Sequence, residues 1–354
     1  MKLVVLQTSV GDYRAEFLSV LLSKFGANFL LLAGERYFDG TTITRVNLGA
    51  NQKTVKNIFM FGNRFSIQFG CWQDVFGADC VVLEQNPRII SNWIFLVGRR
   101  ILGRQTAVWG HAWSRRGKGK GGTFLRDLMG RLAGNVIAYT VNEATTFRNR
   151  LPRVNVFAAP NSLYTQKKIY NRATEQVDSF IYIGRLVPAK KPELAILAFA
   201  KALPSLGEAR LLIVGDGPMR NELEALSKDL GISERVAFLG HINNEEVLSG
   251  LFGKAVASLS PGYVGLSVVQ SFSFGTPVLV ANDEPHSPEI DAVIEGENAI
   301  LFQSDDVDAF SIALIKVWSE RQFWIKRRES IALRCRENYS AERMADGFLE
   351  FVKL

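Results

Sequence analysis

The chain has 354 residues, 47% hydrophobic and 22% charged, which is typical of a globular protein and excludes disordered, collagen-like and coiled-coil chains. Its length exceeds what one hydrophobic core usually serves, so we expect two domains. The net charge of +7 is uneven, because residues 1–160 hold 21 Lys and Arg against nine Asp and Glu, whereas residues 161–354 hold 21 against 26.

Apolar segments of the chain are all short. The longest runs, such as 29–33 and 93–97, are far below the roughly 20 residues that a membrane-spanning helix needs. The run 3–6 is too short for the core of a signal peptide, so we expect a cytoplasmic protein. The three cysteines lack metal-ligand spacing and indicate neither a disulfide framework nor a zinc site.

Apolar runs alternate with helix-length intervals along the whole chain. In the first half we expect strands at 3–7, 29–33, 80–84, 106–110, 136–140 and 154–158. After residue 175 the rhythm restarts, with strands expected at 180–184, 209–215, 236–240, 255–260, 277–281 and 299–302. This pattern is typical of parallel sheets covered by helices on both faces. We therefore predict an α/β fold of two Rossmann-like, doubly wound domains, 1–165 and 166–340, joined through the polar segment 161–175.

Two loops of the first domain have features of ligand or surface contacts. Gly11 begins a Gly-Asp-Tyr-Arg segment after the first strand, where helix-start N–H groups favour an anion, and a turn glycine with a capping Asp12 explains it equally well. Asn86 and Pro87 predict a helix start. The apolar stretch of that helix, 93–97, is either ordinary core or an interfacial surface.

Basic residues concentrate between Arg99 and Arg153, where twelve of them face only Asp127 and Glu143. Such a field attracts lipid headgroups, diphosphates or nucleic acid, although scattered surface arginines also simply aid solubility. The residues that we expect in an acceptor or membrane patch are Arg99, Arg100, Arg104, Arg115, Arg116, Lys118 and Lys120.

Several catalytic motifs are missing. The chain has no nucleophile elbow, no His-x-x-Glu-His zinc motif and no Walker lysine loop, so hydrolase, zincin and P-loop functions lack their residues. The segment 215–218 has too few glycines for a dinucleotide fingerprint. Three aspartates at 305–308 indicate a solvated helix start capped by Ser304 rather than a magnesium site, so we expect no metal.

Two loops of the second domain have residues that favour the binding of phosphate groups. Residues 184–192 follow its first strand and carry Arg185 and Lys190. The planar guanidinium of an arginine and the ammonium of a lysine together suit the negative charge of a departing diphosphate. Residues 261–267 follow a later strand and lead into a helix, whose first N–H groups are free for an anion.

With these two loops, residues 182–302 resemble the nucleotide-sugar-binding lobe of the retaining glycosyltransferases of family four, which have the two-lobed GT-B fold. Four blocks occur in the family order, at 182–203, 211–242, 258–280 and 287–302. The resemblance implies that Arg185 and Lys190 grip the donor diphosphate, with Lys191 as an adjacent candidate. It implies that Gly265, Leu266 and Ser267 offer amides to the phosphates.

The third block departs from the family pattern of two glutamates eight residues apart. This sequence has Gly262 and Gln270 at those positions. The first glutamate typically holds donor-sugar hydroxyls, so here Tyr263 or backbone groups would replace it, and the donor sugar stays open. Gln270 retains an acceptor and two donors for a ribose diol, or is an ordinary polar helix residue.

The resemblance also extends to histidines. His111 follows a strand of the first domain, where family members place a histidine beside the transferred sugar. His241 follows a Phe-Leu-Gly segment whose backbone typically lines the nucleotide base, and His286 precedes a turn near the phosphates. Glu289 either caps a helix or contacts the ligand. The final helix, 341–354, would return to the first domain.

The resemblance implies sugar transfer from a nucleoside diphosphate sugar with retention at the anomeric carbon, with no covalent carboxylate, metal or resident cofactor. The acceptor would be a lipid-linked or cell-surface glycan of lipopolysaccharide, O-antigen or capsule synthesis, at the cytoplasmic face of the inner membrane. A GT-B nucleotide-sugar epimerase is the nearer alternative. A non-catalytic basic protein is the more remote one, and nucleic-acid modules are missing.

Overall fold

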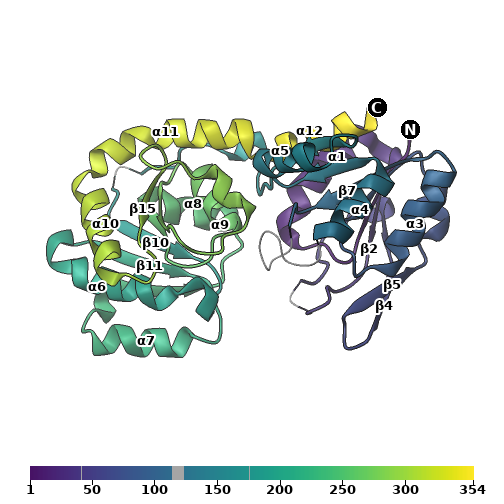
Figure 1. Cartoon of the computed structure of the whole chain (residues 1–354). Coiled ribbons are helices and arrows are strands. Elements are labelled where there is room, and N and C mark those ends of the chain that lie inside the picture. Colours follow the sequence, from purple (N-terminus) through teal and green to yellow (C-terminus); the bar gives the residue numbers. More distant parts are fainter. Residues whose placement is uncertain (41, 114–122, 175) are drawn as a thin grey trace. The chain divides into compact units, whose positions relative to one another are not determined.

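A computed structural model describes residues 1–40, 42–113, 123–174 and 176–354. Those residues divide into two compact units (Figure 1). Unit 1 comprises Met1–Thr165 and Ser340–Leu354, and unit 2 comprises Gln166–Tyr339. Each unit is a three-layer α/β structure built on a parallel sheet, so the predicted fold class is confirmed.

Unit 1 is built on a parallel sheet whose strand order is β3-β2-β1-β6-β7-β8-β9. The strands of unit 1 are β1 (Leu3–Gln7), β2 (Phe29–Ala33), β3 (Gln52–Thr54), β4 (Lys56–Met60), β5 (Phe65–Phe69), β6 (Cys80–Glu84), β7 (Gln105–Gly110), β8 (Asn135–Ala138) and β9 (Asn155–Ala158). Its helices are α1 (Ala15–Phe25), α2 (Trp72–Gly77), α3 (Ile90–Ile101), α4 (Thr123–Ala133), α5 (Val141–Arg150) and α12 (Ala341–Val352).

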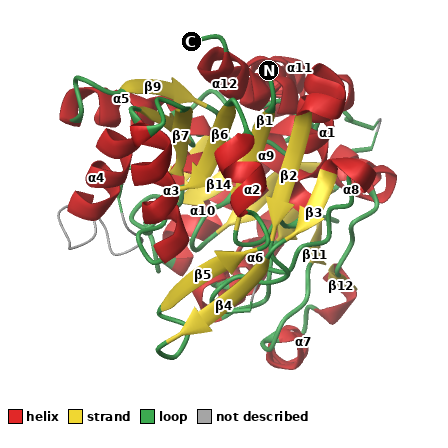
Figure 2. Cartoon of the chain, turned by 90° about the vertical axis from the view of Figure 1, so that its right-hand side faces the viewer, coloured by secondary structure: helices red, strands yellow, loops and turns green. Residues whose placement is uncertain are grey.

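Both faces of this sheet are covered, which explains the continuous apolar strands. Leu3 and Val5 of β1 point into a core with α1 and α12, whereas Val4 and Leu6 point into a second core with α2, α3, α4 and α5. Figure 2 shows the strands of the sheet with α2, α3 and α4 on the near face. Because successive side chains of a strand alternate between faces, every residue of β1 is buried.

The last helix of the chain, α12, is an integral part of unit 1. Its apolar side, including Met344 and Phe348, lies in the same core as β1. The Gln105 side-chain amide donates to the Phe351 carbonyl at 2.5 Å. Gly347 allows this close packing, because a Cβ atom there would lie 2.5 Å from the Ala158 carbonyl oxygen.

Strands β4 and β5 form an antiparallel hairpin that lies outside the parallel sheet (Figure 2). Neither strand was predicted, nor was the short edge strand β3. The three turn residues Phe61, Gly62 and Asn63 all have positive φ angles, of 53°, 63° and 61°. Polar residues interrupt both strands of the hairpin, so they lack the continuous apolar runs that identify the other strands.

Unit 2 has the strand order β12-β11-β10-β13-β14-β15, also all parallel. Its strands are β10 (Ser179–Ile183), β11 (Arg210–Val214), β12 (Val236–Gly240), β13 (Ala255–Ser260), β14 (Val278–Ala281) and β15 (Ala299–Phe302). Its helices are α6 (Pro192–Leu206), α7 (Arg220–Asp229), α8 (Glu245–Lys254), α9 (Leu266–Ser273), α10 (Val307–Ser319) and α11 (Arg321–Asn338).

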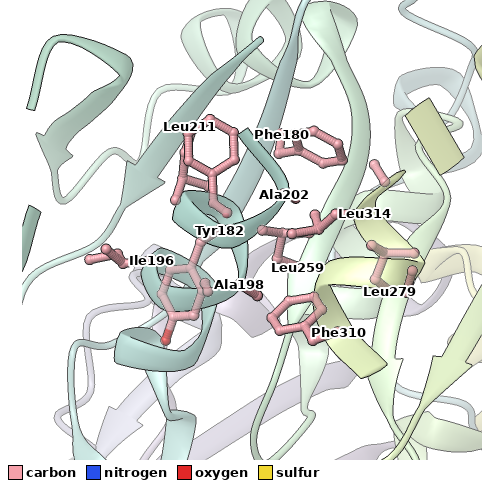
Figure 3. Close-up of a cluster of buried hydrophobic side chains, with 14 of the residues drawn as sticks. Phe180, Tyr182, Ile196, Ala198, Ala202, Leu211, Leu259, Leu279, Phe310 and Leu314 are labelled. Atoms are coloured by element: carbon pink, nitrogen blue, oxygen red, sulfur yellow. The ribbon is translucent and has the colours of Figure 1, made fainter. Parts of the chain in front are cut away.

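One face of the unit 2 sheet packs on α6 and α10. Figure 3 shows Phe180 and Tyr182 of β10 beside Ile196 of α6 and Leu314 of α10 in this core. The strand order reverses between β10 and β13, which is where doubly wound sheets bind ligands. In unit 1 the corresponding reversal lies between β1 and β6.

Two predicted helix starts are wrong. Helix α3 begins at Ile90 rather than at Pro87, because the Asn86 side chain accepts from the Arg88 amide at 3.2 Å and holds a turn there. Asp306, not Ser304, caps α10, and its carboxylate accepts from the Ala309 amide at 2.9 Å.

Candidate functional site

The loops after β10 and β13 meet at the point of strand reversal in unit 2. The Tyr263 amide donates to the Ala189 carbonyl at 3.0 Å, which joins the two loops directly. Gly262 makes this approach possible, because a Cβ atom there would lie 2.7 Å from both the Ala189 oxygen and the Lys190 carbonyl carbon. A glutamate at position 262 therefore does not fit unless one loop moves.

Lys190 is the charged group at the centre of these loops. Its Nζ donates to the Tyr263 carbonyl at 2.5 Å and lies 4.8 Å from the centre of the Tyr263 ring. Burial, and after it repulsion by Arg185, lowers the pKa of Lys190 to about 8, although attraction by Glu289 opposes both effects. An ammonium that is short of compensating negative charge favours an anionic ligand.

Helix α9 begins beside this lysine loop. Its N-cap is Gly265, which has no capping side chain, so Leu266 and Ser267 lie in the first turn, where N–H groups have no partner within the helix. Gln270 lies one turn further along α9 and is half-buried. A cation and a helix N-terminus at one sheet edge suit a phosphate group.

His286 and Ser287 brace the loop that precedes α9. The Val264 amide donates to His286 Nδ1 at 3.1 Å, and His286 Nε2 donates to the Ala281 carbonyl at 2.7 Å. Burial lowers the pKa of His286, which suits this neutral tautomer. The Ser287 hydroxyl donates to the Val264 carbonyl at 2.7 Å. His286 therefore holds the backbone of Val264 in place against that of Ala281.

The other residues of unit 2 that were predicted to bind the donor do not all lie beside Lys190. Glu289 is buried in the 3₁₀ segment Pro288–Ala292, close enough to influence the pKa of Lys190. Lys191 points elsewhere, since its Nζ pairs with Glu284 at 2.5 Å and Asp305 at 2.6 Å, so its charge is already neutralised. His241 is exposed after the edge strand β12, two strands away from β10.

In unit 1, His111 lies at the end of β7 and is held by a buried carboxylate. Its Nδ1 is 3.3 Å from a carboxylate oxygen of Glu143, which is 2% exposed. Glu143 also accepts from the Ala112 amide at 3.0 Å, and its own amide donates to the Thr140 hydroxyl that caps α5. Because a carboxylate only accepts, Nδ1 carries the proton and Nε2 faces away.

A buried arginine, Arg14, lies next to the pair formed by His111 and Glu143. Arg14 is 8% exposed, its guanidinium carbon lies 4.2 Å from the Trp109 ring centre, and it donates to the Tyr139 hydroxyl at 3.3 Å. The Tyr139 ring lies 4.4 Å from the His111 ring, and burial raises the pKa of Tyr139. Gly11 precedes Arg14 and is the N-cap of a 3₁₀ turn.

A second carboxylate, the half-buried Glu84, lies at the end of β6. It accepts from the Thr8 hydroxyl at 2.7 Å and from the Asn86 side-chain amide at 3.1 Å, which joins the ends of β1 and β6. Nearby, Arg126 donates to the Gln85 carbonyl at 2.7 Å, and burial lowers the pKa of Arg126. Sequence reasoning missed Glu84, Glu143 and Arg126, because lone charged residues give no local signal of burial.

The predicted basic patch needs one correction. Arg99 is fully buried, and its guanidinium donates to the carbonyls of Val75, Ala78, Asp79 and Gln105, so it holds α2, α3 and β7 together rather than meeting a ligand. Arg100 and Arg104 are exposed. Arg115, Arg116, Lys118 and Lys120 lie outside the described residues.

Within the described ranges, no cluster of three or more His, Cys, Asp or Glu side chains is arranged to hold a metal ion. In the same part of the chain, no helix combines the length and the apolar character needed to cross a bilayer.

Part of the chain matches the model of a known protein family. Residues 165–337 match the family model "Glycosyl transferases group 1". The chain is 24% identical over 200 residues to "Putative glycosyltransferase EpsD" of Bacillus subtilis, covering 55% of this chain and 52% of that protein. It is 25% identical over 206 residues to "Lipopolysaccharide core biosynthesis glycosyltransferase LpsE" of Rhizobium meliloti, covering 52% and 58%. The chain thus spans only about half the length of these curated relatives.

Solved structures match over the whole chain. The structure of Anabaena Alr3699/HepE in complex with UDP has a TM-score of 0.73 at 15% identity and is covered completely by this chain. The apo form of the lipopolysaccharide outer core galactosyltransferase WaaB has a TM-score of 0.70 at 18% identity, also with complete coverage. At these identities the similarity shows a shared fold, the GT-B fold.

Proposed function

Because residues 165–337 match the family model "Glycosyl transferases group 1", we propose that the whole chain is a retaining glycosyltransferase that uses a nucleoside diphosphate sugar as donor. The observation that supports this most strongly is the arrangement of Lys190, Arg185 and the start of α9 at the strand reversal of unit 2. This arrangement offers two positive charges and free N–H groups at one sheet edge, as a diphosphate requires.

In the proposed reaction the bond between the anomeric carbon and the diphosphate oxygen breaks while the acceptor hydroxyl forms a bond on the same face. The proton of the acceptor passes to the departing diphosphate. Arg185 and Lys190 stabilise the negative charge that grows on this leaving group, and the first turn of α9 contributes backbone N–H groups. No covalent carboxylate intermediate and no metal is part of this proposal.

Unit 1 is proposed to provide His111 and the acceptor site. His111, oriented by Glu143, would hydrogen-bond the donor sugar through Nε2 and so position it, without acting as a general base. Gly11 would lie near the same ligand. In unit 2, Gln270 would bind the ribose, and Tyr263 would take over contacts that a glutamate at position 262 usually makes.

The acceptor is proposed to be a lipid-linked or cell-surface glycan in lipopolysaccharide, O-antigen or capsule synthesis, reached by a peripheral protein at the cytoplasmic face of the inner membrane. Two observations support this: relatives named for lipopolysaccharide core synthesis, and the basic excess of residues 1–160. Exposed Arg100 and Arg104 remain candidates for the patch.

One experiment separates this function from its alternatives. The purified chain is incubated with a panel of nucleoside diphosphate sugars, with and without an extract of membrane lipids. Glycosylated product that forms only with the extract supports a transferase. Conversion of the donor without any acceptor points to an epimerase and contradicts the proposal, and a lack of donor turnover with every sugar would leave only a binding role.

A further inference from the structure

The β4–β5 hairpin of unit 1 has its polar and apolar faces reversed with respect to the protein. Alternate residues of β5, Ser66 and Gln68, are 0% and 1% exposed. Their neighbours Phe65 and Phe69 are 41% and 43% exposed. A two-stranded ribbon at a protein surface normally buries its apolar side and exposes its polar side. The outward apolar side of this hairpin is instead typical of an interaction surface.

The inward face carries the polar side chains together with Phe59, whose ring packs against Phe38, and it is firmly attached to unit 1. The Gln68 amide donates to the Ser91 hydroxyl at 3.3 Å, and the Gln68 side chain donates to Asn57 at 3.1 Å. Asn57 in turn donates to the Thr8 carbonyl at 2.7 Å. The Ser66 amide donates to the Arg88 carbonyl at 2.9 Å. These bonds fix the orientation of the hairpin, so its apolar face stays outward.

The outward face is continuous along both strands. Antiparallel pairing places Ile58 opposite Ile67 and Met60 opposite Phe65, so these side chains share one side. At the turn, Phe61 is 75% exposed and its ring lies 6.2 Å from that of Phe65. Figure 2 shows the hairpin as a separate ribbon at the margin of unit 1. The tip of the hairpin is therefore aromatic and accessible.

Helix α3 extends this apolar character, because it packs against β5 and exposes a row of its own. Ile94, Val97 and Ile101 lie three and four residues apart on one side of α3 and are 45%, 46% and 80% exposed. The sequence left open whether this stretch is core or interfacial surface. Phe95 and Leu96 are core, and the three exposed residues are surface.

The charged residues around the β4–β5 hairpin favour a negatively charged partner. No Asp or Glu occurs between Asp39 and Asp74 in the sequence, whereas Lys56 and Arg64 flank the apolar face and are exposed. An apolar surface with aromatic residues and a cationic border is complementary to an anionic bilayer, where rings enter the headgroup region and cations meet phosphate.

We propose that the β4–β5 hairpin is a membrane-docking element that places Phe61 and Phe65 in the interface of an anionic phospholipid bilayer, with Lys56 and Arg64 on the headgroups. This inference goes beyond the proposed function and names the surface that would bring the protein to a lipid-linked acceptor.

Vesicle sedimentation of the full chain tests this surface. The probes are vesicles of phosphatidylcholine alone and of phosphatidylcholine mixed with phosphatidylglycerol. The double variant F61S/F65S should lower the partition onto the anionic vesicles by roughly tenfold or more, because two apolar rings lose their burial. The variant K56Q/R64Q should lower it by about fivefold for each cation removed, and only at low salt.

A matched control is F323S, which removes a 47% exposed phenylalanine from α11 of unit 2 and should leave the partition unchanged. Site-specific labelling gives a second readout, since the three native cysteines are buried. An environment-sensitive fluorophore on F65C should shift its emission to the blue with anionic vesicles, and the same label on F323C should not.

Equal vesicle binding by F61S/F65S and the wild type would overturn the proposal. So would self-association that depends on Phe61 and Phe65 while vesicles have no effect, because the face would then bind a second copy of the chain. Vesicle binding needs no donor sugar. Its failure would leave the proposed sugar transfer untouched, and a failure of sugar transfer would leave this surface untouched.

Discussion

The sheets of the two units reverse their strand order in the same way, yet the charged side chains that follow their strands differ. In unit 2, the loops after β10 and β13 bring Lys190 beside backbone carbonyls, with no carboxylate bonded to its Nζ among the described contacts. In unit 1, Glu84 ends β6, His111 follows β7, and Glu143 lies in the first turn of α5 after β8. The buried Arg14 and the side chain of Arg126 lie in the same region. The sheet fixes where loops converge, and the loop residues decide which ligand each edge accepts.

This contrast predicts different consequences for the two edges. Substitutions in unit 2 should most strongly affect the binding of the diphosphate and the rate of the chemical step. Changes in unit 1 should affect how the sugar is positioned.

The largest effect is expected from R185A/K190A. Without both cations, the charge on the leaving diphosphate is uncompensated, so kcat/KM should fall by about 10³-fold or more in steady-state assays of donor turnover. The control K201A removes an exposed lysine of α6 that pairs with Asp308, and it should retain full activity. Wild-type turnover by the double variant would contradict the assignment.

The second effect concerns the contact between the two loops of unit 2. The variant G262E restores the residue usual in the family, yet it should lower kcat by about 10²-fold and the free energy of unfolding by about 1–3 kcal/mol, because its Cβ overlaps Ala189 and Lys190. Gly250 of α8 has open space, so G250A should stabilise the protein by about 0.5–1 kcal/mol. Thermal unfolding and kinetics of both variants measure this difference, and a gain of activity in G262E would refute the steric argument.

The third effect sharpens the role of unit 1. In E143Q the amide oxygen still accepts from Ala112, but the charge-assisted bond to His111 is lost, so kcat should fall by about tenfold with little change in stability. The control T140A removes the α5 cap and should cost about 1 kcal/mol of stability while leaving kcat unchanged. If both variants reduced kcat equally, Glu143 would be only a structural residue.

The smallest effect is a pH dependence that originates at Lys190. Its pKa of about 8 in the folded protein lies below the ordinary 10.5. Lys190 therefore loses its proton as the pH rises through 8, and the affinity for a nucleoside diphosphate should fall severalfold. Arg185 and Glu289 are the charged groups that act on it. Calorimetric titration of UDP and GDP at several pH values measures this, and K190R, which stays charged, should flatten the profile.

Linkage gives the matching change in stability. Because the pKa of Lys190 is depressed on folding, the cost of burying its charge is present in full below pH 8 and is relieved as the pH rises from 8 to 10.5. Over that window the wild type should gain stability relative to K190M. Parallel unfolding curves of the two proteins would contradict the burial of this charge.

Most strands of the two parallel sheets were predicted well from the sequence. The bounds of β1, β2, β6, β12, β13 and β15 agree with the predicted ranges at both ends. These strands are short apolar runs bounded by polar or glycine residues. Strands β4 and β5 escaped prediction because most of their apolar residues face outward while the polar Ser66 and Gln68 face inward, which only the tertiary structure decides.

The candidate site was predictable only in part. The two phosphate loops follow strands and contain arginine, lysine and glycine, so position and residue type identified them. Burial of individual charges left no trace in the sequence: Arg99 belongs to a basic cluster in the chain but is fully enclosed by carbonyls. Glu143 gives no local sign of its contact with His111, because the two residues lie on different elements.

The most direct measurement of the central claim is a crystal structure with the nucleoside diphosphate that the donor panel selects. The account predicts that the two phosphates lie within hydrogen-bond distance of Arg185, Lys190 Nζ and the first N–H groups of α9. A diphosphate bound elsewhere, with Lys190 still bonded only to the Tyr263 carbonyl, would contradict it.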